Sequence, residues 1–270
     1  MADVAFGQYY PANSFTHKCD PRTKILFLII FITAIFLSKT FYALGLCALV
    51  FAIVACVSKI PFKSLLKSVK AVLFLLIFTA ILNLFFQKEG EVVFEWTVIK
   101  LTKEGLYATA FLAVRLFLLV LSSSLLTLTT TPVSLTDGLE SLLTPLNWVK
   151  FPVHDLALVM SIALRFIPIL TDETARIMNA QKARGADFES GSLADRVKSI
   201  VPILIPLLVS AFRRADELGD AMDARCYSGS VNRTKYKKLT FTWRDLVAGF
   251  VMIVLLVGVL LIKANFPAVI

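Results

Sequence analysis

LYATAFLAVRLFLLVLSSSLLTL, residues 106–128, is the stretch of sequence that decides the fold. At about 1.5 Å per residue, a helix of this length crosses the roughly 30 Å hydrocarbon core of a bilayer. The rest of the chain agrees, because 57% of its 270 residues are hydrophobic and only 17% are charged, against about 25% in an average soluble domain. The predicted fold class is therefore an all-α integral membrane protein.

Further apolar runs bring the prediction to about five transmembrane helices. They cover residues 25–37, which must extend to 23–39, and residues 41–57, 71–86 and 246–262. Residues 61–70, which precede one of these runs, predict a short basic amphipathic helix at the membrane interface. Residues 91–96 and 97–101 alternate weakly in hydropathy and predict a small hairpin.

Lysine and arginine residues are concentrated before the first span, in residues 58–70 and in residues 129–244. The positive-inside rule places these segments and the N-terminus in the cytoplasm. Residues 87–104 then lie outside, and with five spans the C-terminus is extracellular. This topology, with contact to anionic lipid, accounts for the net charge of +9. Nucleic-acid binding would instead need basic residues on a soluble face with stacking aromatics, so no nucleic-acid partner is expected.

The chain is predicted to have three parts. Residues 1–130 form an N-terminal membrane domain of four spans, residues 131–240 a cytoplasmic module of long helices, and residues 241–270 a C-terminal transmembrane helix. Within the module, residues 155–170 and 200–212 are apolar but contain prolines. Their short length and the prolines favour helices at the inner face of the membrane. The alternative is a membrane hairpin, which would put residues 171–199 outside.

Two short segments of the module share one pattern, Ala-x-x-Ala-Arg-small. They are AQKARG at residues 180–185 and AMDARC at residues 221–226, and their arginines are 41 residues apart. Each segment ends a predicted helix. A C-terminal arginine is commonly explained by its attraction to the helix dipole. The repeated context favours docking instead, because a guanidinium presents a fork of donors suited to carboxylates and carbonyls. The candidate docking residues are Ala183, Arg184, Gly185, Ala224, Arg225 and Cys226.

Two more arginines are candidates for a coupling or a structural role. Arg115 lies near the middle of a predicted span, where charge is expensive and needs a partner. Its partner is expected to be a backbone carbonyl, the Ser122–Ser124 cluster or a group from the cytoplasmic module. Arg165 interrupts the apolar run of residues 155–170. Ala211, Ala215 and Gly219 form a four-residue repeat of small side chains that predicts a close helix–helix contact.

The sequence contains no pattern for catalysis or for binding a cofactor. Its four cysteines match no zinc or redox spacing, and its two histidines are far apart. It lacks a Gly-rich phosphate loop, HExxH and Gly-x-Ser-x-Gly. The chain is therefore not expected to be an enzyme or to bind a metal or cofactor of its own, and if ATP drives it, another chain binds that ATP.

Four stretches taken together resemble the transmembrane T component of energy-coupling factor (ECF) transporters. They are the two Ala-Arg motifs, HKCDPRTK at residues 17–24 before the first span, and LRFIP at residues 164–168 at the start of the coupling region. The resemblance covers nearly the whole chain. Cys226 stands where the family leads one to expect a second glycine.

The resemblance implies a prokaryotic cell-membrane complex with two ATP-binding-cassette ATPases and a small substrate-binding membrane protein, the S component. The residue 131–240 module would be the coupling module, with Arg184 docked on one ATPase and Arg225 on the other. ATP and Mg²⁺ would be bound by those ATPases. The transported substrates would be vitamins or transition-metal ions.

Two other functions are compatible with a multi-span membrane protein. A conventional permease would enclose its own substrate path and should offer more polar groups within its spans. A self-contained membrane enzyme would need paired Glu, His or Asp groups at membrane depth, which the predicted spans lack.

Overall fold

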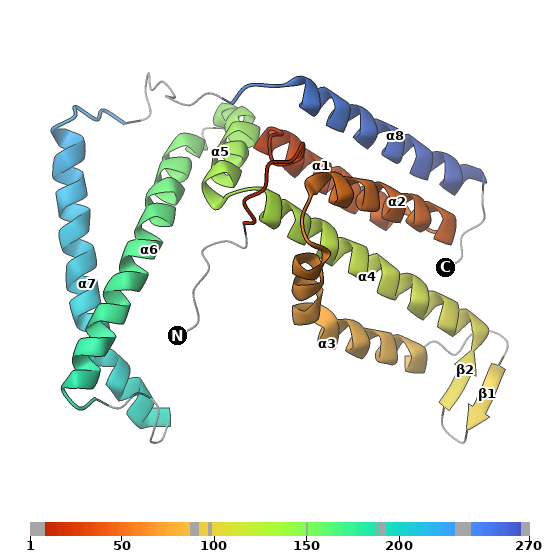
Figure 1. Cartoon of the computed structure of the whole chain (residues 1–270), viewed down its shortest axis with the longest axis horizontal. Coiled ribbons are helices and arrows are strands. Elements are labelled where there is room, and N and C mark those ends of the chain that lie inside the picture. Colours follow the sequence, from red (N-terminus) through yellow and green to blue (C-terminus); the bar gives the residue numbers. More distant parts are fainter. Residues whose placement is uncertain are drawn as a thin grey trace. The chain divides into compact units, whose positions relative to one another are not determined.

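The computed structural model describes residues 9–86, 92–96, 99–149, 151–186, 188, 193–229 and 239–265. Within these residues the chain is almost entirely helical, as predicted, and helices account for both of its compact units (Figure 1). One unit comprises Met1–Leu142 with Lys238–Ile270, and the other comprises Leu143–Lys237.

The first unit contains six of the helices. They are α1 (Pro21–Leu37), α2 (Phe41–Ser58), α3 (Phe62–Phe86), α4 (Lys103–Thr129), α5 (Pro132–Leu143) and α8 (Trp243–Asn265). Three predicted spans are confirmed as single helices, because α2, α4 and α8 are each long and apolar enough to cross a membrane.

Helix α1 is shorter than the predicted first span. The Asp20 side chain caps its N-terminus by accepting a hydrogen bond from the Arg22 N–H at 2.9 Å. The predicted extension to Lys39 is wrong, because Ser38 leaves the helical conformation and ends α1. Both the N–H and the hydroxyl of Ser38 donate to the Ala34 carbonyl, at 3.0 and 2.8 Å. The serine therefore satisfies the last turn and stops the helix.

Helix α3 consists of two parts that meet at an angle of 58° between Phe62–Lys70 and Val72–Asn83. The bend, visible in Figure 1, separates the predicted amphipathic helix from the predicted third span. In the first part Leu65 and Val69 are buried, whereas Lys63 and Lys67 are exposed. This four-residue spacing of apolar and basic positions is the amphipathic pattern that the sequence predicts.

The predicted hairpin is confirmed as two antiparallel strands, β1 (Val92–Trp96) and β2 (Ile99–Thr102). Trp96 pairs with Ile99 next to the turn. Glu91 and Thr97, with which the predicted strands begin, lie outside the described residues.

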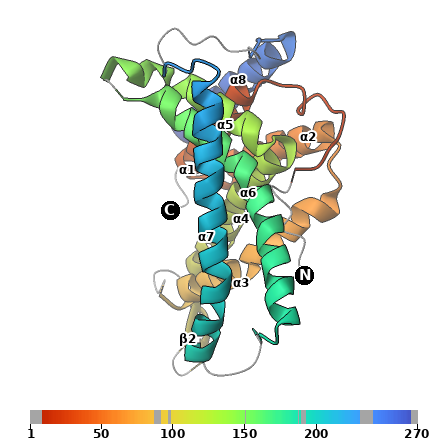
Figure 2. The same ribbon diagram turned by 90° about the vertical axis from the view of Figure 1, so that its left-hand side faces the viewer.

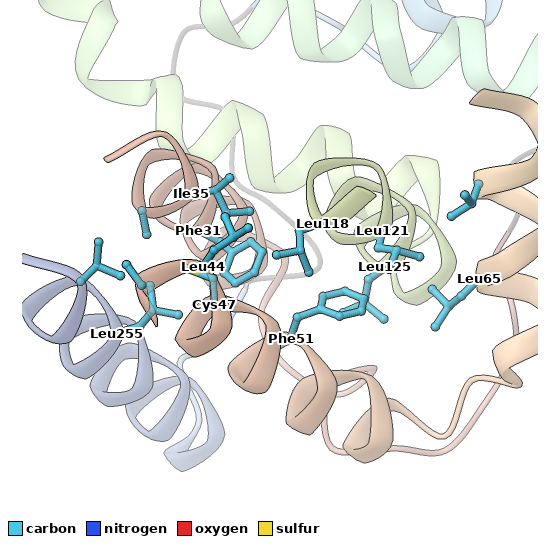
Figure 3. Packing of buried hydrophobic residues seen from close by; sticks show 14 of the residues in the cluster. Phe31, Ile35, Leu44, Cys47, Phe51, Leu65, Leu118, Leu121, Leu125 and Leu255 are labelled. Carbon is cyan, nitrogen blue, oxygen red and sulfur yellow. The ribbon is translucent and has the colours of Figure 1, made fainter. Parts of the chain in front are cut away.

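The core of the first unit is formed by apolar stripes from α1, α2, α4 and α8 (Figure 3). The fully buried side chains at its centre are Phe31, Ile35, Leu44, Cys47, Phe111 and Val259. Helix α5 belongs to this unit and not to the second one. Gly138 approaches α1 so closely that an added Cβ would lie 3.0 Å from the Pro21 Cβ, so only glycine fits at this contact.

The second unit contains a short 3₁₀ helix, η1 (Thr144–Val149), and two long helices that pack together, α6 (Val153–Ala183) and α7 (Leu193–Asp223) (Figure 2). Both long helices continue through internal prolines. The prediction that residues 155–170 are too short to span a membrane is therefore wrong, because α6 is one 31-residue helix that is long and apolar enough to do so. A proline removes a single ladder hydrogen bond, and packing along α7 compensates for that loss.

The stripe of small residues on α7 does not form the predicted helix contact. Ala211 is half-buried, but Ala215 and Gly219 are exposed, and an added Cβ at Gly219 would meet nothing within 4 Å. The α6–α7 contact instead uses Arg214, one position before Ala215, which pairs with Glu173 of α6. Helix periodicity alone did not identify which face of α7 meets α6.

Candidate functional site: two arginine-tipped helix ends

Helix α6 ends in a hydrogen-bonded turn that has Arg184 as its C-cap. The Gly185 N–H donates to the Lys182 carbonyl at 3.0 Å, and the Ala186 N–H donates to the Gln181 carbonyl at 3.0 Å. These two bonds define a Schellman motif, which requires the residue after the C-cap to be left-handed. Gly185 meets this requirement with φ of +88°.

Helix α7 ends in the same motif with Arg225 as its C-cap. The Cys226 N–H donates to the Asp223 carbonyl at 2.9 Å, and the Tyr227 N–H donates to the Met222 carbonyl at 3.1 Å. Cys226 occupies the left-handed position with φ of +54°. The cysteine therefore closes the second turn as glycine closes the first, at the cost of strain that glycine avoids.

The two arginines consequently have the same local setting, although they are 41 residues apart. Arg184 and Arg225 are both exposed, and within the described part of the chain neither guanidinium makes a hydrogen bond or ion pair. Each follows an exposed alanine, Ala183 or Ala224. A guanidinium with small neighbours and free donors is available to a partner's acceptors.

The two tips also lie at matched distances from a contact between the helices. The Arg214 Nη2 lies 3.5 Å from the Glu173 Oε2. Glu173 precedes Arg184 by eleven residues, and Arg214 precedes Arg225 by eleven. At 1.5 Å per residue, each tip is about 16 Å along its helix from this contact. Because α6 and α7 run in opposite directions (Figure 1), the tips lie at opposite ends of the helix pair.

This crossing pair was not identified from the sequence, although one signal was present. Glu173 and Arg214 are 41 residues apart, which is the spacing of the two arginine motifs. An opposite-charge pair separated by the motif spacing is the pattern that could have indicated the crossing.

Arg115 is held by a backbone carbonyl, which is one of its predicted partners. Its Nη2 donates to the Ser38 carbonyl at 2.7 Å, at the end of α1. Its Cζ lies 4.7 Å from the centre of the Phe111 ring, one turn earlier on α4. Arg115 therefore joins α4 to the α1 terminus and stacks on an aromatic face, which is a structural use of an intramembrane charge.

Arg165 is exposed on α6, and the described residues provide no hydrogen bond or ion pair to its side chain. It lies within an apolar surface of the second unit. The exposed apolar residues of α7 include Ile200, Leu204, Leu208 and Phe212, each more than half exposed. Large exposed apolar surfaces mark sites of contact with proteins or membranes.

A polar cluster under the N-terminal segment is a further feature that the sequence did not indicate. The Asp245 carboxylate of α8 accepts from the Asp20 N–H and the Thr242 N–H, both at 2.8 Å. The Lys24 Nζ donates to the Thr129 carbonyl at 3.0 Å, at the end of α4. These bonds connect the starts of α1 and α8 and the end of α4, so the cluster fixes one end of the first unit.

Burial alters two titratable groups in this N-terminal segment. It lowers the pKa of His17, although the Tyr10 carbonyl, 3.0 Å from Nε2, acts in the opposite direction. Burial, with the nearby Asp245 carboxylate, raises the pKa of the Cys19 thiol. Cys19 is thus an unreactive buried thiol. Among the described residues no group of three His, Cys, Asp or Glu side chains is arranged to hold a metal ion.

Comparison with known proteins places these features in a family. Residues 12–236 match the model of the CbiQ family, described as cobalt transport protein. The chain is 49% identical over 266 residues to the energy-coupling factor transporter transmembrane protein EcfT of Ruminiclostridium cellulolyticum, covering 98% of this chain and 99% of that one. It is 50% identical over 259 residues to EcfT of Brevibacillus brevis, covering 95% and 97%. EcfT of Bacillus subtilis is 45% identical over 245 residues, covering 91% and 92%.

Proposed function

Because the chain belongs to the family of energy-coupling factor transporter transmembrane proteins, we propose that it transmits the conformational change of two ABC ATPases to a substrate-binding S component in the cell membrane. The complex imports a vitamin or a transition-metal ion. The observation that carries the proposal is the pair of identical Schellman turns, each presenting an exposed arginine. Two equal tips fit two equal ATPase partners.

Arg184 docks on one ATPase and Arg225 on the other, with their flanking residues Gly185 and Cys226 forming the turns. Truncating one member of a buried charged pair costs about 2–5 kcal/mol. At 1.4 kcal/mol per factor of ten, that weakens ATPase binding by roughly 30-fold or more. Lysine should rescue poorly, because it replaces a planar fork of donors with a point charge.

The test is co-purification of the ATPases with Arg184→Ala, Arg225→Ala and their lysine counterparts. Arg176→Ala and Arg213→Ala are matched controls, since both are exposed arginines on the same helices away from the tips. Loss of ATPases from the tip variants alone supports docking. Normal ATPase recovery and normal transport in both tip alanine variants would falsify it.

The S component binds the exposed apolar surface of the second unit. Leu204 and Leu208 are each 54% exposed on α7, so a partner can bury them. Leu204→Glu should release the S component while the ATPases stay bound. Recovery of the S component with this variant at the normal level would show that its site lies elsewhere.

Both tips lie in the cytoplasm, together with the N-terminal segment. The first α6 half carries only Asp155 and Arg165 as charges, whereas its second half holds Asp172, Glu173 and Arg176. That charged half is better placed in water than in hydrocarbon. A membrane-impermeant maleimide tests this placement in inverted vesicles and in intact cells. Native Cys226 and an Ala183→Cys variant should react only in inverted vesicles, and reaction of Ala183→Cys in intact cells would place α6 across the membrane.

A further inference from the structure

We propose that the first unit binds an anionic phospholipid, with an acyl chain in a cavity between α1, α2, α4 and α8 and the phosphate beside Arg244. The cavity has a volume of about 270 Å³ and is closed at one end by residues 15–19. It belongs entirely to the first unit. This site is independent of the docking of the ATPases and the S component.

The cavity wall selects an apolar occupant. Its lining is mostly aliphatic and aromatic side chains from the four helices. Its polar side chains are largely engaged elsewhere: Thr16 donates to Ser58 at 2.9 Å, and Ser122 and Thr129 donate to carbonyls of their own helix. Lys24 donates to three oxygen atoms. A water molecule needs two to four polar partners, and this wall has few to offer.

The size of the cavity suits a hydrocarbon chain. A dry protein cavity of about 150 Å³ already admits benzene, and this one is larger. The cost of leaving a cavity empty rises with its volume, so a chain that fills it stabilises the bundle.

The cavity opens toward the surface that meets lipid. Among its lining residues Ile53 and Val57 of α2 are 55% and 42% exposed, and Val247 of α8 is 38% exposed. Both helices are long and apolar enough to cross a membrane. An acyl chain can therefore enter from the bilayer between their exposed faces.

Basic side chains surround the closed end of the cavity. The Arg244 Cζ lies 5.9 Å from the centre of the Phe15 ring, and Phe15 lines the cavity. Lys18 and Lys59 are exposed and each adjoins a lining residue. The carboxylates nearby, Asp20 and Asp245, are buried and accept backbone N–H groups, so the exposed charge at this rim is positive. Positive charge beside an apolar cavity matches a phospholipid with an anionic head group.

The test uses the purified full chain in a neutral detergent, titrated with phosphatidylglycerol or with phosphatidylcholine of the same acyl composition. Native mass spectrometry measures bound lipid, and thermal unfolding measures the rise in Tm. We expect phosphatidylglycerol to bind more tightly and to raise Tm further than phosphatidylcholine does. Arg244→Gln should weaken phosphatidylglycerol binding roughly tenfold, the loss typical of one charge-assisted hydrogen bond. Lys263→Gln, at the far end of the same helix, is the control and should leave binding unchanged.

The cavity itself is tested by Val251→Phe, which places a ring in the space that the chain would occupy. We expect this variant to lose bound lipid and the lipid-dependent rise in Tm. Ala248→Leu provides a smaller filling change should the ring disturb folding. The proposal is overturned if the two lipids bind equally, if Arg244→Gln retains the preference, or if a folded filled variant keeps its lipid.

Discussion

The contact between Glu173 and Arg214 should set the angle between α6 and α7, and Glu173→Gln should loosen that angle without unfolding the protein. The pair is 3.5 Å apart with side chains 29% and 36% exposed, so it contributes only about 0.2–1 kcal/mol to stability. Its larger effect is geometric. Each arginine tip lies about 16 Å from the contact, so a rotation of about 10° moves each tip by about 3 Å.

The assay is the distance between spin labels on the two helix tips. Native Cys226 labels one tip, and Ala183→Cys labels the other in a background in which exposed Cys56 is replaced by serine. We expect Glu173→Gln to broaden or shift the distance distribution by a few ångströms, with little change in Tm. Asp172→Asn is the matched control, because it removes a neighbouring exposed carboxylate that is not in the contact.

A charge swap completes the argument. Glu173→Arg combined with Arg214→Glu restores the opposite charges and should narrow the distribution again. An unchanged distribution in Glu173→Gln would refute the idea that this pair holds the crossing. An equally broad distribution in the swapped protein would show that the charge pairing is not the cause.

Three further predictions concern single residues. Cys226→Gly removes the strain of a left-handed cysteine, about 1–2 kcal/mol, against about 0.4–1 kcal/mol of added chain entropy, so amide exchange at the α7 tip should slow; faster exchange would contradict this strain argument. Arg115→Ala leaves the Ser38 carbonyl without its 2.7 Å donor and should lower stability by about 1.5–3 kcal/mol, seen as a fall in Tm that Arg115→Lys partly reverses. Burial lowers the pKa of His17 below its ordinary 6.5, so the N-terminal segment, when released, binds protons more readily than when packed. Its attachment should be complete above pH 6.5 and weaken as pH falls below it, and hydrogen exchange should lose this pH dependence in His17→Gln.

Much of the fold could be predicted from local sequence, because the bilayer imposes a length on any helix that spans it. The runs behind α2, α4 and α8 were identified for that reason. The bend of α3 follows from a change in pattern from basic amphipathic to apolar near Lys70. The first span was extended too far, because composition does not reveal that Ser38 and Arg115 together terminate α1.

The sequence by itself determined that this is a multi-span membrane protein with two equivalent arginine motifs, since both follow from composition and local spacing. Only the tertiary structure decided that Cys226 takes the left-handed place of a glycine, that Ala215 and Gly219 face away from α6, and that Glu173 meets Arg214. Those features depend on backbone dihedrals and on which face of a helix meets its neighbour. Several faces of an amphipathic helix satisfy the same apolar periodicity, and packing against a specific partner selects one of them.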